Sequence, residues 1–150
     1  MIPRTPPPSL AAPCLLIIDD DDSVREVFRC ILRRHYRIIE ASGVDEALLL
    51  IDRECPDLVT LDIRMPGKDG LEGLRLLRER NENLPVVVIT GFGSNDTACE
   101  AVQLGASGYL KKPCGPTQLL ATIHNHLRKS QRYHHPGSST KGHHSGLRAV

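Results

Sequence analysis

Five short runs rich in apolar residues alternate along the chain with longer segments in which apolar residues recur at helical spacing. Each run spans four to six residues, which is too short for a helix and typical of a buried β-strand. The run at 85–90 is rich in β-branched residues, as in a strand covered on both faces. We predict five strands, at residues 14–18, 36–40, 58–61, 85–90 and 108–112.

The segments between these runs predict five helices. The first has an i, i+3, i+4, i+7, i+8 apolar pattern, with Asp22 or Ser23 available as its N-cap. That pattern is formed by Val24, Val27, Phe28, Ile31 and Leu32. A second helix opens at a segment that resembles a capping box, 42–45, and a third runs from Gly70 to about Asn81.

The last two helices are predicted from their caps and their apolar stripes. Ser94 or Asn95 can cap the fourth helix, which carries a thin stripe including Ala101 and Val102 and ends near Gly105. The fifth follows Pro116, and its inner face is formed by Leu119, Leu120, Ile123 and Leu127.

Alternating strands and helices predict an α/β fold in which parallel strands are joined by right-handed crossovers, with helices on both faces of the sheet. The 150 residues suffice for one domain with a full core. We place that domain at residues 14–128. A proline-rich lead-in at 1–13 and a basic tail rich in His, Gly and Ser at 129–150 are expected to be disordered.

Charge and cysteine content narrow the functional class. Residues 1–127 contain 14 Lys and Arg against 18 Asp and Glu, whereas residues 128–150 contain five bases and no acid. Tyr133 is the one Phe, Tyr or Trp residue in the basic tail, so direct nucleic-acid binding is disfavoured. The five cysteines match no zinc spacing, and we expect reduced, mostly buried thiols. The apolar run at 14–18 is too short for a membrane span, so we expect a cytoplasmic protein with no membrane contact.

Polar residues follow four of the predicted strands. Asp19 and Asp20 follow the first strand, Asp62 the third, Thr90 ends the fourth, and Lys112 ends the fifth. Because parallel strands end at one edge of a sheet, we expect these residues to share a pocket. Crowded carboxylates repel one another unless a cation joins them, and an all-oxygen ligand set suits Mg²⁺. The cluster therefore predicts a magnesium site.

The same residues suit phosphoryl transfer to the Asp62 carboxylate. A metal ion would neutralise oxygens on both Asp62 and the incoming phosphate. The Lys112 ammonium would pair with those oxygens, and the Thr90 hydroxyl could donate to one of them.

Four sequence blocks contain all of these residues. They are Ile17-Ile18-Asp19-Asp20-Asp21, Leu61-Asp62-Ile63-Arg64-Met65-Pro66-Gly67-Lys68-Asp69-Gly70, Val88-Ile89-Thr90-Gly91 and Gly108-Tyr109-Leu110-Lys111-Lys112-Pro113. In this order and spacing they resemble the signature blocks of the receiver domains of two-component response regulators, over roughly residues 14–128. The resemblance implies a flavodoxin-like, doubly wound five-stranded parallel sheet of order 2-1-3-4-5 with five helices.

The resemblance also implies a function for the predicted pocket. Asp62 would be the phosphoacceptor, and Mg²⁺ would be held by Asp19, Asp20, Asp62 and the backbone carbonyl of Arg64. The phosphoryl donor would be a sensor histidine kinase or a phosphotransfer protein. The chemistry would be confined to phosphotransfer onto the chain itself and autodephosphorylation, so we do not expect an enzyme.

A switch is implied as well. Thr90, Tyr109 and Lys112 would respond to the phosphoryl group, and the Lys112–Pro113 peptide bond would be cis. The surface of the fourth helix, fifth strand and fifth helix would then change partners, toward a downstream protein target or a second phosphorylated copy. Two departures from the family pattern are Cys114, where an aromatic residue is usual, and Asp22, where a proline is frequent.

Three alternatives stay open at this point. The chain could be the receiver portion of a larger transcriptional regulator, because the loop at 91–93 resembles receivers that precede transcription-activating domains. A phosphatase of the haloacid dehalogenase type also uses a strand-end aspartate, but it needs a second carboxylate where this chain has Arg64. A flavodoxin-like cofactor binder needs a phosphate loop after the first strand, where the four aspartates of 19–22 would repel phosphate.

Overall fold

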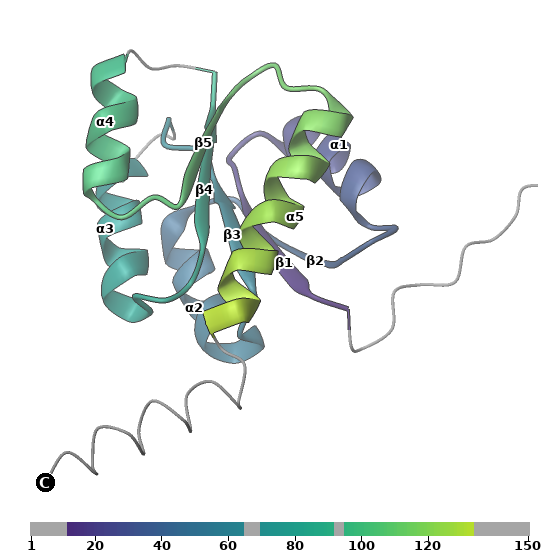
Figure 1. The fold of residues 1–150 in the computed structure, drawn as a ribbon, viewed down its shortest axis with the longest axis horizontal. Coiled ribbons are helices and arrows are strands. Elements are labelled where there is room, and N and C mark those ends of the chain that lie inside the picture. Colours follow the sequence, from purple (N-terminus) through teal and green to yellow (C-terminus); the bar gives the residue numbers. More distant parts are fainter. Residues whose placement is uncertain (1–11, 65–69, 92–94, 134–150) are drawn as a thin grey trace, which may run out of the picture.

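A single parallel sheet forms the centre of the molecule in the computed structural model, which describes residues 12–64, 70–91 and 95–133. Its strand order is β2-β1-β3-β4-β5, and every neighbouring pair is parallel. Figure 1 shows the sheet nearly edge on, with α2, α3 and α4 on one side and α1 and α5 on the other. The predicted doubly wound α/β fold with order 2-1-3-4-5 and five helices is confirmed.

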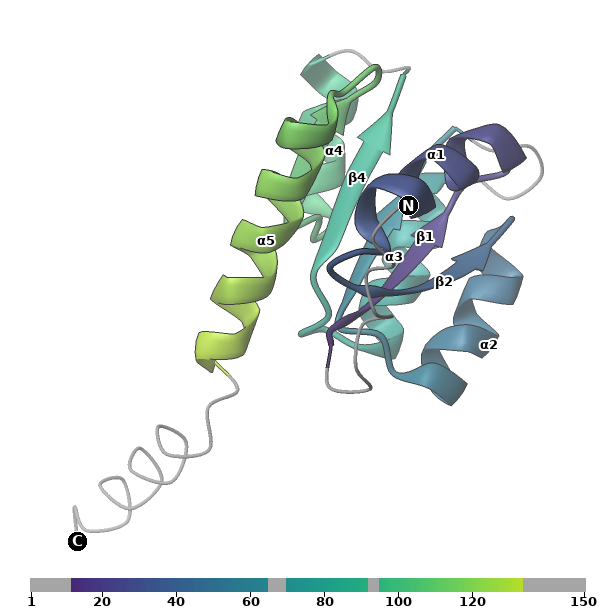
Figure 2. The ribbon, with the colours of Figure 1, turned by 90° about the vertical axis from the view of Figure 1, so that its right-hand side faces the viewer.

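The elements alternate strictly along the chain. The strands are β1 (Cys14–Ile18), β2 (Arg37–Ala41), β3 (Leu58–Leu61), β4 (Val86–Thr90) and β5 (Gly108–Lys111). The helices are α1 (Asp22–Leu32), α2 (Val44–Glu54), α3 (Gly70–Arg80), α4 (Asn95–Gln103) and α5 (Pro116–Tyr133). Figure 2 shows α5 running along β4 and extending beyond the sheet.

Three strand ends differ from the prediction by one residue, since β2 ends at Ala41, β4 begins at Val86 and β5 ends at Lys111 rather than at Lys112. Two further ends differ for reasons visible in the backbone. The second strand begins at Arg37 because the Tyr36 N–H donates to the Leu32 carbonyl at 3.0 Å, which makes Tyr36 part of the turn that closes α1. The fifth helix continues to Tyr133, past residue 128, where we expected the tail to begin. The remainder of that tail and nearly all of the proline-rich lead-in lie outside the described residues.

The helix caps also differ from the prediction. The N-cap of α1 is Asp21, whose carboxylate accepts from the Ser23 and Val24 N–H groups, so Asp22 and Ser23 were wrong as caps. An N-cap needs an extended backbone, which Asp21 has, whereas Asp22 is already helical. At α2 the N-cap is Gly43, which makes no side-chain cap bond. The candidate caps of α4 are not described at the side-chain level.

Alternate residues of each central strand belong to two separate apolar layers, one on each face of the sheet. Leu16, Ile18 and Val88 belong to the layer that packs against α2, α3 and α4, while Leu15 and Ile17 belong to the layer against α1 and α5. Successive side chains on a strand point to opposite faces, so a central strand covered on both sides must be apolar throughout. All residues of β1, β3 and β4 are buried.

Some predicted burial was wrong. Val27 and Val102 were assigned to apolar helix faces, yet their side chains are 55% and 58% exposed. The five cysteines are free thiols, and Cys30, Cys55 and Cys99 are exposed rather than buried as expected. Nowhere in the described part of the chain is a helix both long and apolar enough for a bilayer crossing.

The buried layer beneath α3 should dominate stability. We expect Leu74→Ala, at a fully buried position of α3, to lower the free energy of unfolding by about 2–5 kcal/mol through lost burial and a residual cavity. The matched control Leu49→Ala, at a position 70% exposed on α2, should change it by less than about 0.5 kcal/mol. Urea unfolding of both variants measures this, and equal losses would contradict the assignment of the core.

Candidate functional site

The residues that follow β1, β3 and β5 are held at one sheet edge by backbone hydrogen bonds that extend the strand pairing. The Asp62 N–H donates to the Ile18 carbonyl at 3.0 Å, and the Lys112 N–H donates to the Thr90 carbonyl at 2.9 Å. The Asp19 N–H is held in the same way by β2. Because all strands are parallel, this carboxyl edge collects the ends of distant segments.

Three carboxylates meet at this edge, as the sequence predicted. Asp19, Asp20 and Asp62 each present an oxygen within 4.8 Å of the others, a spacing that could hold a metal ion. Asp19 and Asp62 are buried at 2% and 8% exposure, while Asp20 is exposed. A set of carboxylate oxygens open to solvent on one side fits a hard divalent cation that keeps water ligands. The donor set is therefore chemically suitable for such an ion.

Both buried carboxylates are oriented by hydrogen bonds from the backbone. Asp19 Oδ1 accepts from the Asp21 N–H at 3.0 Å, and Asp62 Oδ1 accepts from the Arg64 N–H at 2.9 Å. The structure thus connects Arg64 to Asp62 through its N–H, and the predicted role of the Arg64 carbonyl stays a prediction. These bonds hold the carboxylates in fixed orientations before any ion arrives.

Lys112 lies between the two buried carboxylates. Its Nζ donates to Asp19 Oδ2 at 2.6 Å and to Asp62 Oδ2 at 2.9 Å. Burial lowers the pKa of Lys112, but the hydrogen bonds and charges of the two aspartates outweigh it, and the pKa lies above its usual value. The ammonium is therefore charged at neutral pH. The Lys112–Pro113 bond is cis, as the resemblance implied.

The pKa of Asp19 indicates that additional positive charge would stabilise the ionised carboxylate cluster. Burial raises the pKa of Asp19, and the negative charge of Asp62 adds to that rise. The hydrogen bond from Lys112, the Asp21 N–H and the Lys112 charge lower the pKa without cancelling the rise. Three carboxyl groups facing one ammonium form a site whose negative charge a metal cation would neutralise.

Thr90 and Tyr109 share one face of the sheet. Thr90 ends β4 and is fully buried. Tyr109 pairs with Val88 across β4 and β5, and its half-buried side chain packs against the layer beneath α2, α3 and α4. Because Val88 and Thr90 are two residues apart on a strand, they point to the same face. A change at Thr90 therefore acts on the side of the sheet where Tyr109 packs.

Arg25 contributes to the site, although sequence reasoning did not single it out. Its Nη1 donates to the Asp19 carbonyl at 2.6 Å, and its Nε donates to Glu40 at 3.3 Å. It also pairs with the exposed Asp22 carboxylate. The i, i+3 spacing of Asp22 and Arg25 could have signalled the helix pair alone. The contact with Glu40 depends on β2 lying beside β1.

Comparison with protein families gives a match over most of this fold. A family model described as the response regulator receiver domain matches residues 15–124. That span includes every strand residue except Cys14 and all of the clustered carboxylates.

Two curated relatives show how much of a longer protein this match represents. The chain is 35% identical over 117 residues to the regulatory protein LuxO of Vibrio cholerae, covering 77% of this chain and 26% of that protein. It is 38% identical over 118 residues to the response regulator MprA of Mycobacterium leprae, covering 78% of this chain and 52% of that protein. The chain thus spans about a quarter to a half of these relatives.

Solved structures share the same architecture. A receiver domain protein from Methanospirillum hungatei superposes with a TM-score of 0.79 at 27% identity, covering 82% of this chain and 99% of that one. The BeF3-activated receiver domain of RstA from Klebsiella pneumoniae superposes with a TM-score of 0.72 at 35% identity, covering 77% of this chain and 98% of that one.

Removing the ammonium should destabilise the metal-free protein in a pH-dependent way. Lys112→Met leaves two buried carboxylates facing each other, and we expect a loss of about 1–3 kcal/mol near neutral pH. The substitution raises the pKa of Asp19 further above its unfolded value. Asp19 contributes its full stabilisation below its unfolded pKa, and this contribution is lost as pH rises through its folded pKa. Lowering the pH should therefore reduce the stability difference between Lys112→Met and the unchanged chain.

Urea unfolding in EDTA at about pH 7 and about pH 5 measures this difference. The control is Lys111→Met, since Lys111 is exposed at the adjacent position. A deficit that is equal at both pH values, or shared by the control, would contradict the role of Lys112 in neutralising the carboxylates.

Proposed function

The chain belongs to the receiver domains of response regulators, and from this premise we propose that it is a phosphorylation-dependent signalling switch with Asp62 as phosphoacceptor. The observation that supports the proposal is the position of the Asp62 carboxylate. It lies 2.9 Å from the Lys112 ammonium and within 4.8 Å of two further carboxylates at the carboxyl edge of a parallel sheet. No separate substrate is needed, because the reacting carboxylate is part of the protein.

The contacts of Asp62 suit attack on a phosphorus atom. The Arg64 N–H and the Lys112 ammonium fix the two oxygens of the carboxylate, which reduces the reorganisation required for in-line transfer. Lys112 would pair with the phosphoryl oxygens once the group has moved from its donor. Mg²⁺, held by Asp19, Asp20, Asp62 and the Arg64 carbonyl, would supply neutralisation of the negative charge on both partners when bound.

The switch would begin with the charge that phosphorylation adds. A phosphoryl group brings about −1.5 to −2 charges, which the buried Thr90 hydroxyl can meet by donating a hydrogen bond. Tyr109 lies on the same sheet face and would turn inward as Thr90 moves. The surface formed by α4, β5 and α5 would then present a different shape to partners.

The proposed partners follow from that chemistry. A sensor histidine kinase or a phosphotransfer protein would donate the phosphoryl group, and the α4, β5 and α5 surface would contact a downstream protein or a second phosphorylated copy. We place these events in the cytoplasm, a setting that suits free thiols at all five cysteines. Autodephosphorylation would end the signal.

A second candidate is that the chain represents the receiver portion of a larger transcriptional regulator. It is favoured by the relatives themselves, which include transcriptional regulatory proteins such as AfsQ1 of Streptomyces coelicolor, of which the chain covers 53%. In that case output would come from a further domain. An aspartate-nucleophile phosphatase is disfavoured, because the position two residues after Asp62 is the exposed Arg64 rather than a carboxylate.

Loss of the phosphoacceptor should abolish labelling. We expect Asp62→Asn to incorporate no phosphoryl group from acetyl phosphate with Mg²⁺, because an amide of the same shape lacks the nucleophilic oxygen. The matched control is Asp52→Asn, an identical change on α2 outside the site, which should label fully. Intact-mass spectrometry measures the stoichiometry, and full labelling of Asp62→Asn would overturn the assignment.

Loss of Asp20 should weaken metal binding without harming the fold. Asp20 is exposed, so Asp20→Asn should leave metal-free stability unchanged while raising the Mg²⁺ dissociation constant by about tenfold or more. For the unchanged chain, Mg²⁺ at 100 times its dissociation constant should stabilise by about 2.7 kcal/mol. Thermal unfolding across a Mg²⁺ titration measures both effects, with Asp52→Asn as the control. Identical titration curves for all three proteins would exclude Asp20 as a ligand.

A further inference from the structure

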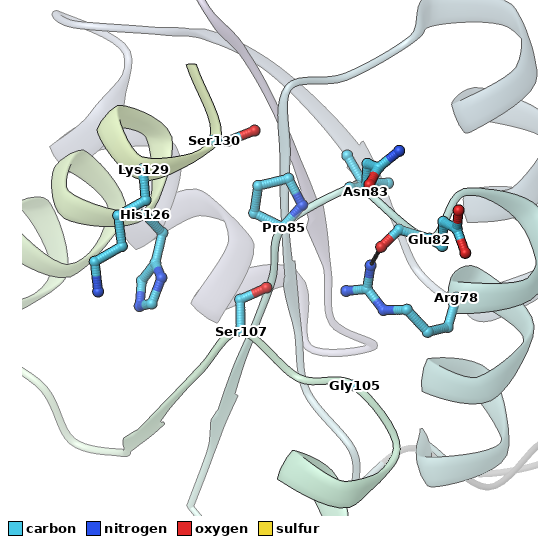
Figure 3. Close-up of a pocket in the computed structure, with 10 residues that line it drawn as sticks. Arg78, Glu82, Asn83, Pro85, Gly105, Ser107, His126, Lys129 and Ser130 are labelled. Carbon is cyan, nitrogen blue, oxygen red and sulfur yellow. Dashed lines mark hydrogen bonds between the residues drawn. The ribbon is translucent and has the colours of Figure 1, made fainter. Parts of the chain in front are cut away.

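A cavity lies at the sheet edge opposite Asp62. Its volume is about 390 Å³, and it is walled by the end of α3, the loops before β4 and β5, and the last turns of α5. Figure 3 shows Arg78 entering from α3 on one side, with His126 and Lys129 from α5 on the other. The proposed signalling function uses none of these residues.

The guanidinium of Arg78 is only half satisfied. Its Nη1 donates to the Glu82 carbonyl at 2.8 Å and to the Asn81 carbonyl at 3.3 Å. Its Nε and Nη2 are buried and have no hydrogen-bond partner within the described part of the chain. A buried charged donor without a partner is costly to the folded state. These two nitrogens form one edge of the guanidinium, which matches two oxygens of a single oxyanion.

The wall of the cavity opposite Arg78 is formed by α5 and carries basic side chains. His126 and Lys129 are three residues apart on α5 and face the cavity together (Figure 3). Burial lowers the pKa of His126, and the positive charge of Lys129 lowers it further. Glu82 is the one carboxylate among the described lining residues, and Figure 3 shows it on the far side of Arg78 from His126. Arg78 and Lys129 therefore place positive charge on both walls of the cavity.

Two glycines allow these side chains to occupy their positions. Gly105 has a φ of +103°, and a Cβ there would lie 2.9 Å from Arg78 Cγ and Nε. A Cβ at Gly108 would lie 2.5 Å from His126 Nε2. Each wall therefore packs against backbone that only glycine leaves open. Arg78 and His126 are seated by the fold, as a binding site requires.

We propose that this cavity binds the phosphate group of a small phosphate ester, with Arg78, which lines the cavity, as the primary anchor. A carboxylate would be satisfied by Arg78 alone, whereas a tetrahedral phosphate carries further oxygens, for which Lys129 supplies a second cation on the other wall. The volume exceeds that of phosphate and falls in the range of small-molecule pockets, which leaves room for an organic group.

The test uses the full chain without Mg²⁺, at constant ionic strength, and follows the Arg78 Nε–H resonance and the Gly105 and Ser107 amides by NMR. The probes are inorganic phosphate and glycerol phosphate. We expect saturable shifts with a dissociation constant of about 1 mM or below, which corresponds to about −4 kcal/mol. Arg78→Gln should weaken binding at least tenfold. The matched control Arg80→Gln removes a cation from the same helix that pairs with Asp52, and should bind normally.

Two further variants distinguish binding in this cavity from unfolding and from binding at the Asp62 site. Lys129→Gln, at an exposed position, should weaken phosphate binding severalfold while leaving the fold intact, so it keeps the test valid if Arg78→Gln unfolds. Asp62→Asn should leave these shifts unchanged, which separates this site from phosphotransfer. No movement of the Arg78 resonance, equal shifts with chloride, or unaltered binding by Lys129→Gln would overturn the proposal. Acetate binding as tightly as phosphate would overturn the phosphate assignment.

Discussion

One ammonium group shared by two buried carboxylates is the interaction on which the candidate site depends. Lys112 joins Asp19 and Asp62 from positions 93 and 50 residues away in sequence, and it can do so only because β1, β3 and β5 are parallel and end at one edge. Buried carboxylates are costly unless they are paired. The parallel sheet therefore brings the two carboxylates together, and the Lys112 ammonium offsets the repulsion between their negative charges.

The surrounding contacts hold this charge cluster in one arrangement. Backbone N–H groups fix one oxygen of each buried carboxylate, and Arg25 holds the Asp19 backbone from α1. The cluster nevertheless remains short of positive charge, because burial still raises the pKa of Asp19. The backbone contacts therefore fix the geometry of the site, while its negative charge is only partly neutralised. That combination suits a site that gains a cation and a phosphoryl group without rebuilding its backbone.

The two edges of the sheet gather side chains of opposite charge. The carboxyl edge gathers acids around Asp62, while the amino edge places Arg78 and Lys129 around a cavity. Two nitrogens of the Arg78 guanidinium have no hydrogen-bond partner among the residues that the structure describes. Both arise from the same parallel topology, since the ends of strands and the loops that precede them lie on opposite rims. Binding at one rim is therefore separable from chemistry at the other, although α5 contributes to both the cavity and the proposed output surface.

The sequence alone determined the element order, the parallel sheet and the convergence of Asp19, Asp62 and Lys112, because strand and helix periods and strand-end residues are local signals. It misplaced the α1 cap and the burial of Val27, which depend on which backbone geometry and which neighbour each residue meets. The half-satisfied Arg78 is likewise a tertiary result. Its free edge exists because the loops before β4 and β5 enclose a guanidinium whose sequence neighbours satisfy only Nη1. No spacing along the chain encodes that enclosure.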